Sequence, residues 1–230
     1  MCADTSAVPK KLPMEEHAGQ LRISEIFLSL QGESRSVGYP TVFVRLTGCP
    51  LRCGYCDTSY AFQGGQWITV DAILAQIATY ETRHITVTGG EPLAQKLCVD
   101  LLTHLCDAGY VVSLETSGAL DVSAVDVRVV KVMDIKTPGS GEVDKNLWQN
   151  IEHLSSQDQI KFVLCDRNDY DWAKQILKQY QLLSCCEILF SPSHEQMEAK
   201  TLAAWILEDK LQIRFQLQLH KILWDNEPGR

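Results

Sequence analysis

The chain has 230 residues, of which 45% are hydrophobic and 22% are charged, proportions typical of a globular protein with one sizeable core. Its formal net charge of −8, without any block of basic residues, argues against binding to nucleic-acid phosphates. No segment has the composition of a signal peptide or a membrane span, so we expect a cytoplasmic protein with no membrane partner. We expect residues 1–20 to form a mobile N-terminal tail and residues 21–230 to form a single domain.

Segments with strand and helix patterns alternate along the chain. The alternating apolar run at 26–30 is compatible with an edge strand, and 42–46 with the first core strand. The later expected elements are helix 70–80, strand 84–88, helix 92–106, strands 110–114, 127–133 and 160–164, helix 169–180, strand 187–190, helix 195–207 and strand 212–217. Repeated strand-helix units indicate a parallel sheet. About six such strands are too few to close an eight-stranded barrel, so we predict an α/β fold: an open partial (β/α)6 barrel with a small N-terminal strand extension.

Five polar motifs follow the expected strands. Because the carboxyl ends of parallel strands meet at one edge, these motifs should converge on one mouth. They are the loops Gly48–Thr58, Thr88–Pro92, Glu115–Gly118, Asp134–Lys136 and Ser191–His194.

The first of these loops carries three cysteines, Cys49, Cys53 and Cys56, in the spacing C-x3-C-x2-C. A closed zinc site or an ordinary iron-sulfur cluster needs four protein ligands, so three thiolates on a cubane would leave one iron open. The alternative is a zinc site completed by a remote His84 or His194. We expect the cysteines at 98, 106, 185 and 186 to be small, buried, apolar side chains without a metal. No role is predicted for Cys165 or for the polar C-terminal end.

The cysteine triplet, Tyr55 just before its last cysteine, and the later Thr88-Gly89-Gly90-Glu91-Pro92 together resemble the radical S-adenosylmethionine (SAM) superfamily. The resemblance implies that the cysteines hold a [4Fe-4S] cluster and that SAM chelates its fourth iron. It also implies reductive cleavage of SAM to a 5′-deoxyadenosyl radical that abstracts a substrate hydrogen.

A second resemblance is narrower. Leu30-Gln31-Gly32-Glu33 ahead of the cluster, Arg45 four residues before the first cysteine, and Cys56-Asp57-Thr58 resemble the 7-carboxy-7-deazaguanine synthase family. This resemblance implies a lyase of queuosine and 7-deazapurine biosynthesis, which converts 6-carboxy-5,6,7,8-tetrahydropterin to 7-carboxy-7-deazaguanine and releases ammonia. Two alternatives stay open: an activase that installs a glycyl radical on another enzyme, and a non-catalytic iron-sulfur or zinc module.

The family resemblance also implies a set of substrate contacts. The Arg45 guanidinium suits the substrate carboxylate, and its place inside an apolar run beside the cluster favours this role over the alternative of a surface ion pair. Glu115 is expected to face the reacting carbon; alternatively, it is a buried carboxylate paired with a lysine. The pterin edge and the rest of the substrate would contact Leu30, Gln31, Gly32, Glu33 and Thr88.

For the cofactors, the resemblance implies that Gly89 and Gly90 receive the methionine ammonium of SAM. It also implies that the adenine side of SAM contacts Tyr55, Cys56 and Asp57. The ribose and the carboxylate of SAM would contact Ser117, Asp134, Ile135, Lys136 and Ser191. Many relatives have Ser-Pro-Lys where this chain has Asp-Ile-Lys, which leaves Asp134 the least supported of this set. Thr58 matches a Mg²⁺ ligand, and His220-Lys221 a segment that closes over the site. A reductant such as flavodoxin or ferredoxin and a homodimer are also expected.

Overall fold

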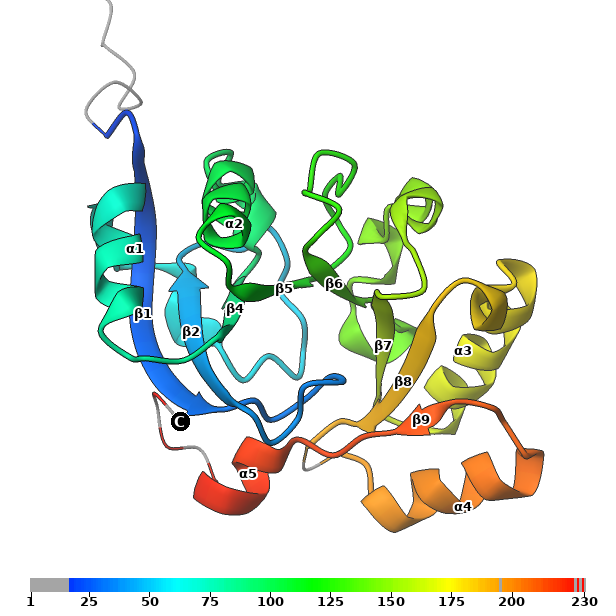
Figure 1. Cartoon of the computed structure of the whole chain (residues 1–230). Coiled ribbons are helices and arrows are strands. Elements are labelled where there is room, and N and C mark those ends of the chain that lie inside the picture. The colour runs from blue at the N-terminus through cyan, green and yellow to red at the C-terminus, as the bar shows by residue number, and fades with distance from the viewer. Residues whose placement is uncertain (1–16, 195, 226, 228, 230) are drawn as a thin grey trace, which may run out of the picture.

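A single sheet of nine strands forms the framework of the computed structural model, which describes residues 17–194, 196–225, 227 and 229 (Figure 1). The strand order is β3-β1-β2-β4-β5-β6-β7-β8-β9. Neighbouring strands run parallel from β2 through β9, whereas β1 pairs antiparallel with both β2 and β3. The bounds are β1 Gln20–Leu30, β2 Pro40–Leu46, β3 Gln66–Thr69, β4 His84–Gly89, β5 Val111–Thr116, β6 Val130–Asp134, β7 Gln159–Leu164, β8 Glu187–Pro192 and β9 Arg214–Phe215. Since β3 and β9 stand at the two ends of the order and do not pair with each other in the described part of the chain, the sheet is open, and the predicted open partial barrel with an N-terminal extension is confirmed.

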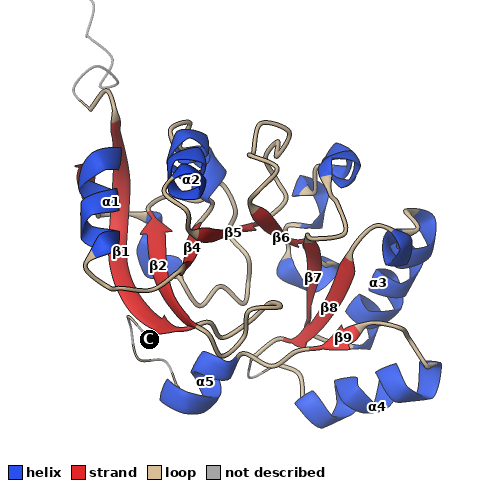
Figure 2. Ribbon diagram, viewed as in Figure 1, coloured by secondary structure: helices blue, strands red, loops and turns tan. Residues whose placement is uncertain are grey.

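Four helices lie along the outer, convex face of the curved sheet (Figures 1 and 2). They are α1 Val70–Ala78, α2 Cys98–Asp107, α3 Arg167–Gln179 and α4 Ala199–Asp209. The short α5, Leu219–Trp224, returns to the loop after β1, where the Leu219 N–H donates to the Gly32 carbonyl over 2.9 Å. The concave face of the sheet is therefore covered by loops and by α5, and not by the four outer helices.

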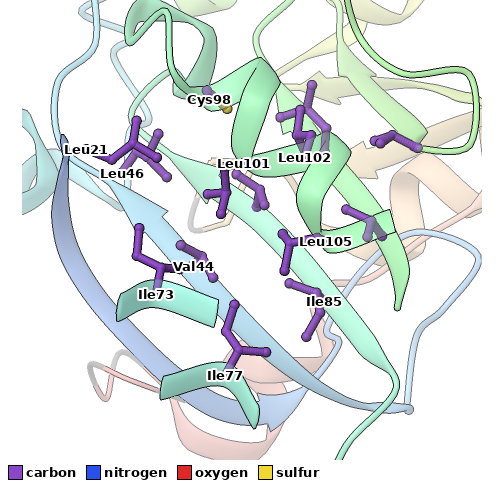
Figure 3. Close-up of a cluster of buried hydrophobic side chains, with 14 of the residues drawn as sticks. Leu21, Val44, Leu46, Ile73, Ile77, Ile85, Cys98, Leu101, Leu102 and Leu105 are labelled. Carbon is purple, nitrogen blue, oxygen red and sulfur yellow. The ribbon is translucent and has the colours of Figure 1, made fainter. Parts of the chain in front are cut away.

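The core has two hydrophobic clusters, one under each pair of outer helices. The first joins α1 and α2 to β1, β2, β4 and β5, and Figure 3 shows Leu101 and Leu105 of α2 facing Val44 and Ile85 of the sheet. The second joins α3 and α4 to β7 and β8, with Phe162, Tyr170 and Phe190 at its centre. Both clusters use alternate strand residues, which leaves the intervening residues for the concave face.

The largest departure from the predicted elements is the expected helix 92–106. A 3-10 turn at Pro92–Ala94 precedes α2, which begins only at Cys98. Gln95 interrupts the helix, because its side-chain amide donates to the carbonyls of Arg22 and Thr47 over 2.9 Å each. A single continuous helix is therefore wrong, since a long-range contact outweighs the local helical pattern.

Other boundaries differ by a few residues. The expected strand 212–217 is reduced to the two residues of β9, and the sequence pattern missed β3 and α5 altogether. Helix α4 begins at Ala199, while position 195, where we expected its start, lies outside the described residues.

The N-terminal tail is only partly covered by the structure. Residues 1–16 lie outside the described part, His17 to Gly19 form a turn, and Gln20 already belongs to β1. No helix in the described part of the chain is long and apolar enough to span a membrane.

Candidate active site

One pocket occupies the concave face, and the two-residue period of the strands supplies its walls. On β2, Val42, Val44 and Leu46 point into the core, so Phe43 and Arg45 line the pocket. The same alternation on β4 to β7 gives the pocket Thr88, Glu115, Val132, Asp134, Lys161 and Val163. The five sequence motifs do converge on one region of the sheet, because residues from all of them line this pocket.

The three cysteines of the first motif all open into this pocket and are partly buried. The Leu51 N–H donates to Cys49 Sγ over 3.4 Å. Burial raises the pKa of the Cys49 and Cys53 thiols, and the nearby Lys136 ammonium acts in the opposite direction on both. Binding of a metal cluster would therefore have to displace protons from these thiols.

The cysteine set fits a cluster with one open corner better than a closed zinc site. No group of three or more His, Cys, Asp or Glu side chains in the described part of the chain is arranged to hold a single metal ion. Thiolates of a cubane bind three different irons, so they need not converge on one point. Of the two proposed zinc partners, His194 lines the pocket, whereas His84, at the start of β4, lies against Tyr39 with the rings tilted by 32° and their centroids 4.8 Å apart.

Glu91 links two loops that line the pocket, and the sequence analysis gave it no role. Its side chain is fully buried, and its carboxylate accepts hydrogen bonds from the Ser117 N–H (2.7 Å) and hydroxyl (2.5 Å). The Thr116 hydroxyl (2.9 Å) and the Leu93 N–H (3.0 Å) also donate to it. Glu91 thereby ties the Gly-Gly loop after β4 to the loop after β5. An acidic residue between the glycine pair and the proline of the Gly-Gly-Glu-Pro motif was the sequence signal available for it.

Glu115 is surrounded by two residues expected to contact the substrate. Its carboxylate accepts from the Gln31 amide and from the Thr88 hydroxyl, each over 3.3 Å. Burial raises the pKa of Glu115 and the nearby Glu33 raises it further, while Lys161, Arg45 and Gln31 oppose the shift. The structure thus brings Gln31, Thr88 and Glu115 into one hydrogen-bonded group.

Arg45 is both part of the pocket lining and part of an ion pair. Its Nε donates to Glu25 Oε1 over 2.7 Å, and the Tyr60 hydroxyl donates to the same oxygen over 2.8 Å. The Arg45 side chain is 15% exposed, so this pair is partly buried, unlike an ordinary surface ion pair. Glu25 therefore fixes the guanidinium from one side.

Lys161 of β7 was not predicted as a site residue, yet it lies among the charges of the pocket. Its Nζ is 2.7 Å from Glu33 Oε2 and 3.5 Å from Asp134 Oδ2. Burial acts to lower the pKa of Lys161, but Glu33, Asp134 and Glu115 outweigh it and raise the pKa above its ordinary value. A lysine at a strand position that alternates with the apolar Ile160 and Phe162 was the sequence signal that could have identified it.

The residues expected to bind SAM do not all meet. Asp134 and Lys136 form an ion pair (3.1 Å), and the Lys136 ammonium lies 5.9 Å from the ring centroid of Tyr55. Ile135, by contrast, is buried in the second core cluster, and Ser191 is buried in β8; neither lines the pocket. Cys56, Asp57, Gly89, Gly90 and Ser117 line the pocket.

Thr58, the expected Mg²⁺ ligand, lines the pocket and donates its hydroxyl to Asp57 Oδ1 over 2.8 Å. Burial acts to raise the pKa of Asp57, but this hydrogen bond and the Lys221 ammonium outweigh it and lower the pKa. The hydroxyl does not cap the following 3-10 turn. The pair offers two neighbouring oxygen donors of the kind that Mg²⁺ prefers.

The C-terminal helix α5 covers one side of the pocket. Lys221 Nζ is 3.4 Å from Asp57 Oδ2, and a Cβ atom at Gly32 would collide with His220. His220 lines the pocket, and its burial lowers its pKa. This close approach explains why a glycine stands at position 32.

Comparison with known proteins identifies the family of the chain. Residues 43–133 match the radical SAM superfamily. The 7-carboxy-7-deazaguanine synthase of Chlorobaculum tepidum is 44% identical over 208 residues, covering 89% of this chain and 94% of the relative, and that of Koribacter versatilis is 40% identical over 222 residues, covering 90% and 98%. The crystal structure of QueE from Escherichia coli has the same fold, with a TM-score of 0.73, 24% identity, and coverage of 87% of this chain and 95% of that one. The chain belongs to the 7-carboxy-7-deazaguanine synthase family, within the radical SAM superfamily.

Proposed function

We propose that this protein is a radical SAM carbon-nitrogen lyase that converts 6-carboxy-5,6,7,8-tetrahydropterin to 7-carboxy-7-deazaguanine and releases ammonia. Its relatives of 44% and 40% identity carry the corresponding name. The observation that carries the proposal is that the cysteine triplet opens into the same pocket as Arg45, Gln31, Thr88 and Glu115.

The [4Fe-4S] cluster and SAM, when bound, supply the one-electron chemistry that starts the reaction. The protein must hold the substrate beside them and exclude water, which would otherwise quench the reaction. The pocket walls suit that task, since Phe27, Phe43 and Phe62 line it together with the polar residues.

On the substrate side, Arg45 would bind the pterin carboxylate with the guanidinium nitrogens that Glu25 does not use. The Gln31 amide, with the backbone of Leu30 and Gly32, would contact the pterin edge. Glu33 Oε1 is buried and has no hydrogen-bond partner in the described part of the chain, which suits a donor group of the heterocycle. Glu115 and Thr88 would lie at the reacting carbon, where the raised pKa of Glu115 lets it hold a proton.

On the cofactor side, the carbonyls of Gly89 and Gly90 would accept the SAM ammonium, and Lys136 would meet its carboxylate. Tyr55, Cys56 and Asp57 would contact the adenine. Asp134 can accept from ribose hydroxyls, whereas the Ser117 hydroxyl is already committed to Glu91. Ile135 and Ser191 support the proposed site from the core and not by direct contact.

Thr58 would ligate Mg²⁺ together with substrate oxygens, because a lone hydroxyl is a weak ligand for a hard cation. Exchange of Thr58 for Val should therefore raise the Mg²⁺ concentration needed for half-maximal turnover.

We also propose that the protein is cytoplasmic, that it forms a homodimer, and that a small electron donor such as flavodoxin or ferredoxin reduces it.

The decisive experiment incubates the anaerobically reconstituted, reduced protein with SAM, Mg²⁺ and 6-carboxy-5,6,7,8-tetrahydropterin. Mass spectrometry should show the product of ammonia loss together with 5′-deoxyadenosine. Cleavage of SAM without the deazapurine would favour a glycyl-radical activase instead. Iron, sulfide and zinc analysis of the same sample tests the cluster independently of turnover.

A further inference from the structure

Lys161 joins the two halves of the pocket through one ammonium group. It lies in β7 with its side chain 12% exposed, 2.7 Å from Glu33 Oε2 and 3.5 Å from Asp134 Oδ2. Glu33 belongs to the loop after β1, on the proposed substrate side, and Asp134 ends β6, on the proposed SAM side. Asp134 and Lys161 are direct partners in the β6–β7 register, so the sheet itself fixes their separation.

The loop that carries Glu33 crosses the concave face from β1 to the opposite end of the sheet. The Ser34 N–H donates to Gln216 Oε1 (2.6 Å), and the Arg35 N–H donates to Gln159 Oε1 (2.9 Å). These bonds fix the backbone of the loop near β7 and β9. Lys161 fixes the Glu33 carboxylate itself, which leaves Oε1 as the oxygen without a partner among the described residues.

Removal of the Lys161 charge would leave the buried Glu33 carboxylate without a compensating charge and would leave Asp134 with Lys136 as its remaining ion-pair partner among the described residues. Glu33 is 6% exposed and the Asp134 side chain is 16% exposed, and Glu115 is a third acidic group nearby. An uncompensated buried charge is strongly unfavourable, so the Glu33 carboxylate would take up a proton or move away. Either change would remove the acceptor that Glu33 Oε1 presents to the pocket.

Building on the proposed function, we propose that Lys161 is a positioning residue that aims the Glu33 carboxylate at the pterin and the Asp134 carboxylate at SAM. It needs no contact with the reacting atoms. Because one ammonium holds both carboxylates, its loss should weaken the binding of both molecules.

The test measures binding to the anaerobically reconstituted protein, with fluorescent 6-carboxypterin as the substrate probe and SAM in a separate titration. K161M should weaken 6-carboxypterin binding about tenfold or more, as expected for loss of a hydrogen bond to a charged group. SAM binding should weaken in the same variant, and the charge-retaining K161R should recover part of both affinities. Normal affinity of K161M for either molecule would overturn the proposal.

The chain offers a matched control for a general loss of stability. Lys131 of β6 forms a similarly buried pair with Asp158 (3.2 Å, side chains 5% and 0% exposed), and neither residue lines the pocket. K131M should lower stability at least as much as K161M and leave both affinities unchanged. Equal weakening by K131M would mean that Lys161 acts only through stability.

A double-mutant cycle tests whether Lys161 acts through Glu33. If it does, K161M combined with E33Q binds 6-carboxypterin no more weakly than the worse single variant. Additive losses would contradict that route. The proposed function is tested by a different measurement on the parent protein. It is wrong if that protein releases no ammonia from 6-carboxy-5,6,7,8-tetrahydropterin.

Discussion

Gly90 packs so closely against Cys49 that a Cβ atom at position 90 would lie 2.6 Å from the Cys49 Cβ and 2.5 Å from the Gly48 carbonyl oxygen. The next N–H, that of Glu91, donates to that same Gly48 oxygen over 2.8 Å. The Gly-Gly loop after β4 is thus a direct support of the cysteine loop after β2. Gly90 is required by packing, whatever it contributes to the binding of SAM.

We predict that G90A displaces the cysteine loop and lowers the iron and sulfide content of the reconstituted protein. The clash involves backbone and a Cβ atom, which cannot rotate away as a long side chain can. Chemical analysis and the cluster absorbance measure the loss. The matched control is G54A in the same loop, where an added Cβ meets nothing within 4 Å and should leave the iron content unchanged. Full iron content in G90A would contradict the packing argument.

We predict that E91Q destabilises the protein by about 2 to 4 kcal/mol. Glu91 is fully buried, and the groups around its carboxylate are hydrogen-bond donors from Leu93, Thr116 and Ser117. An amide NH₂ would face one or more of these donors and leave them unsatisfied. Urea unfolding gives the change, and E198Q, at an exposed position, should stay within about 0.5 kcal/mol of the parent. A small effect of E91Q would show that the buried network can rearrange.

Much of this arrangement follows from local signals in the sequence. The expected strands 42–46 and 84–88 correspond to β2 and β4, and the strand-end motifs predicted that five loops meet at one mouth. Contacts between distant segments were not predictable in this way. Gln95 breaks a helical pattern through the backbone of Arg22 and Thr47, and Lys161 of β7 contacts Glu33 of the distant loop after β1. Ser191 and Ile135 occupy strand-end positions but lie in the core, since a motif position does not fix which face a side chain takes.

We predict that Glu115 makes folding less favourable as the pH rises. Burial first, and Glu33 second, raise the pKa of Glu115 in the folded protein. The folded state therefore binds this proton more tightly than the unfolded state, whose pKa is near 4.5. The resulting stability is full below that value and is lost as the pH rises through the folded-state pKa.

The measurement compares urea unfolding of the parent and E115Q between about pH 4 and about pH 9. The parent should lose stability relative to E115Q by about 1.4 kcal/mol for each unit by which the pKa is raised, and the difference should then level off. A constant difference across this range would mean that Glu115 does not titrate with a raised pKa.

The final prediction concerns Arg45, whose partly buried pair with Glu25 leaves the rest of the guanidinium facing the pocket. R45A should keep a full cluster and still cleave SAM, but the yield of deazapurine per SAM cleaved should fall about tenfold or more, because a charged hydrogen-bond donor to the substrate carboxylate is lost. R45K should recover only part of the yield, since lysine lacks the planar fork. Product and 5′-deoxyadenosine are quantified together in one assay. R128A, which removes an exposed arginine paired with Asp107 and Asp126, is the matched control and should keep the parent ratio. Normal coupling in R45A would refute the carboxylate role and leave Arg45 as a partner of Glu25 alone.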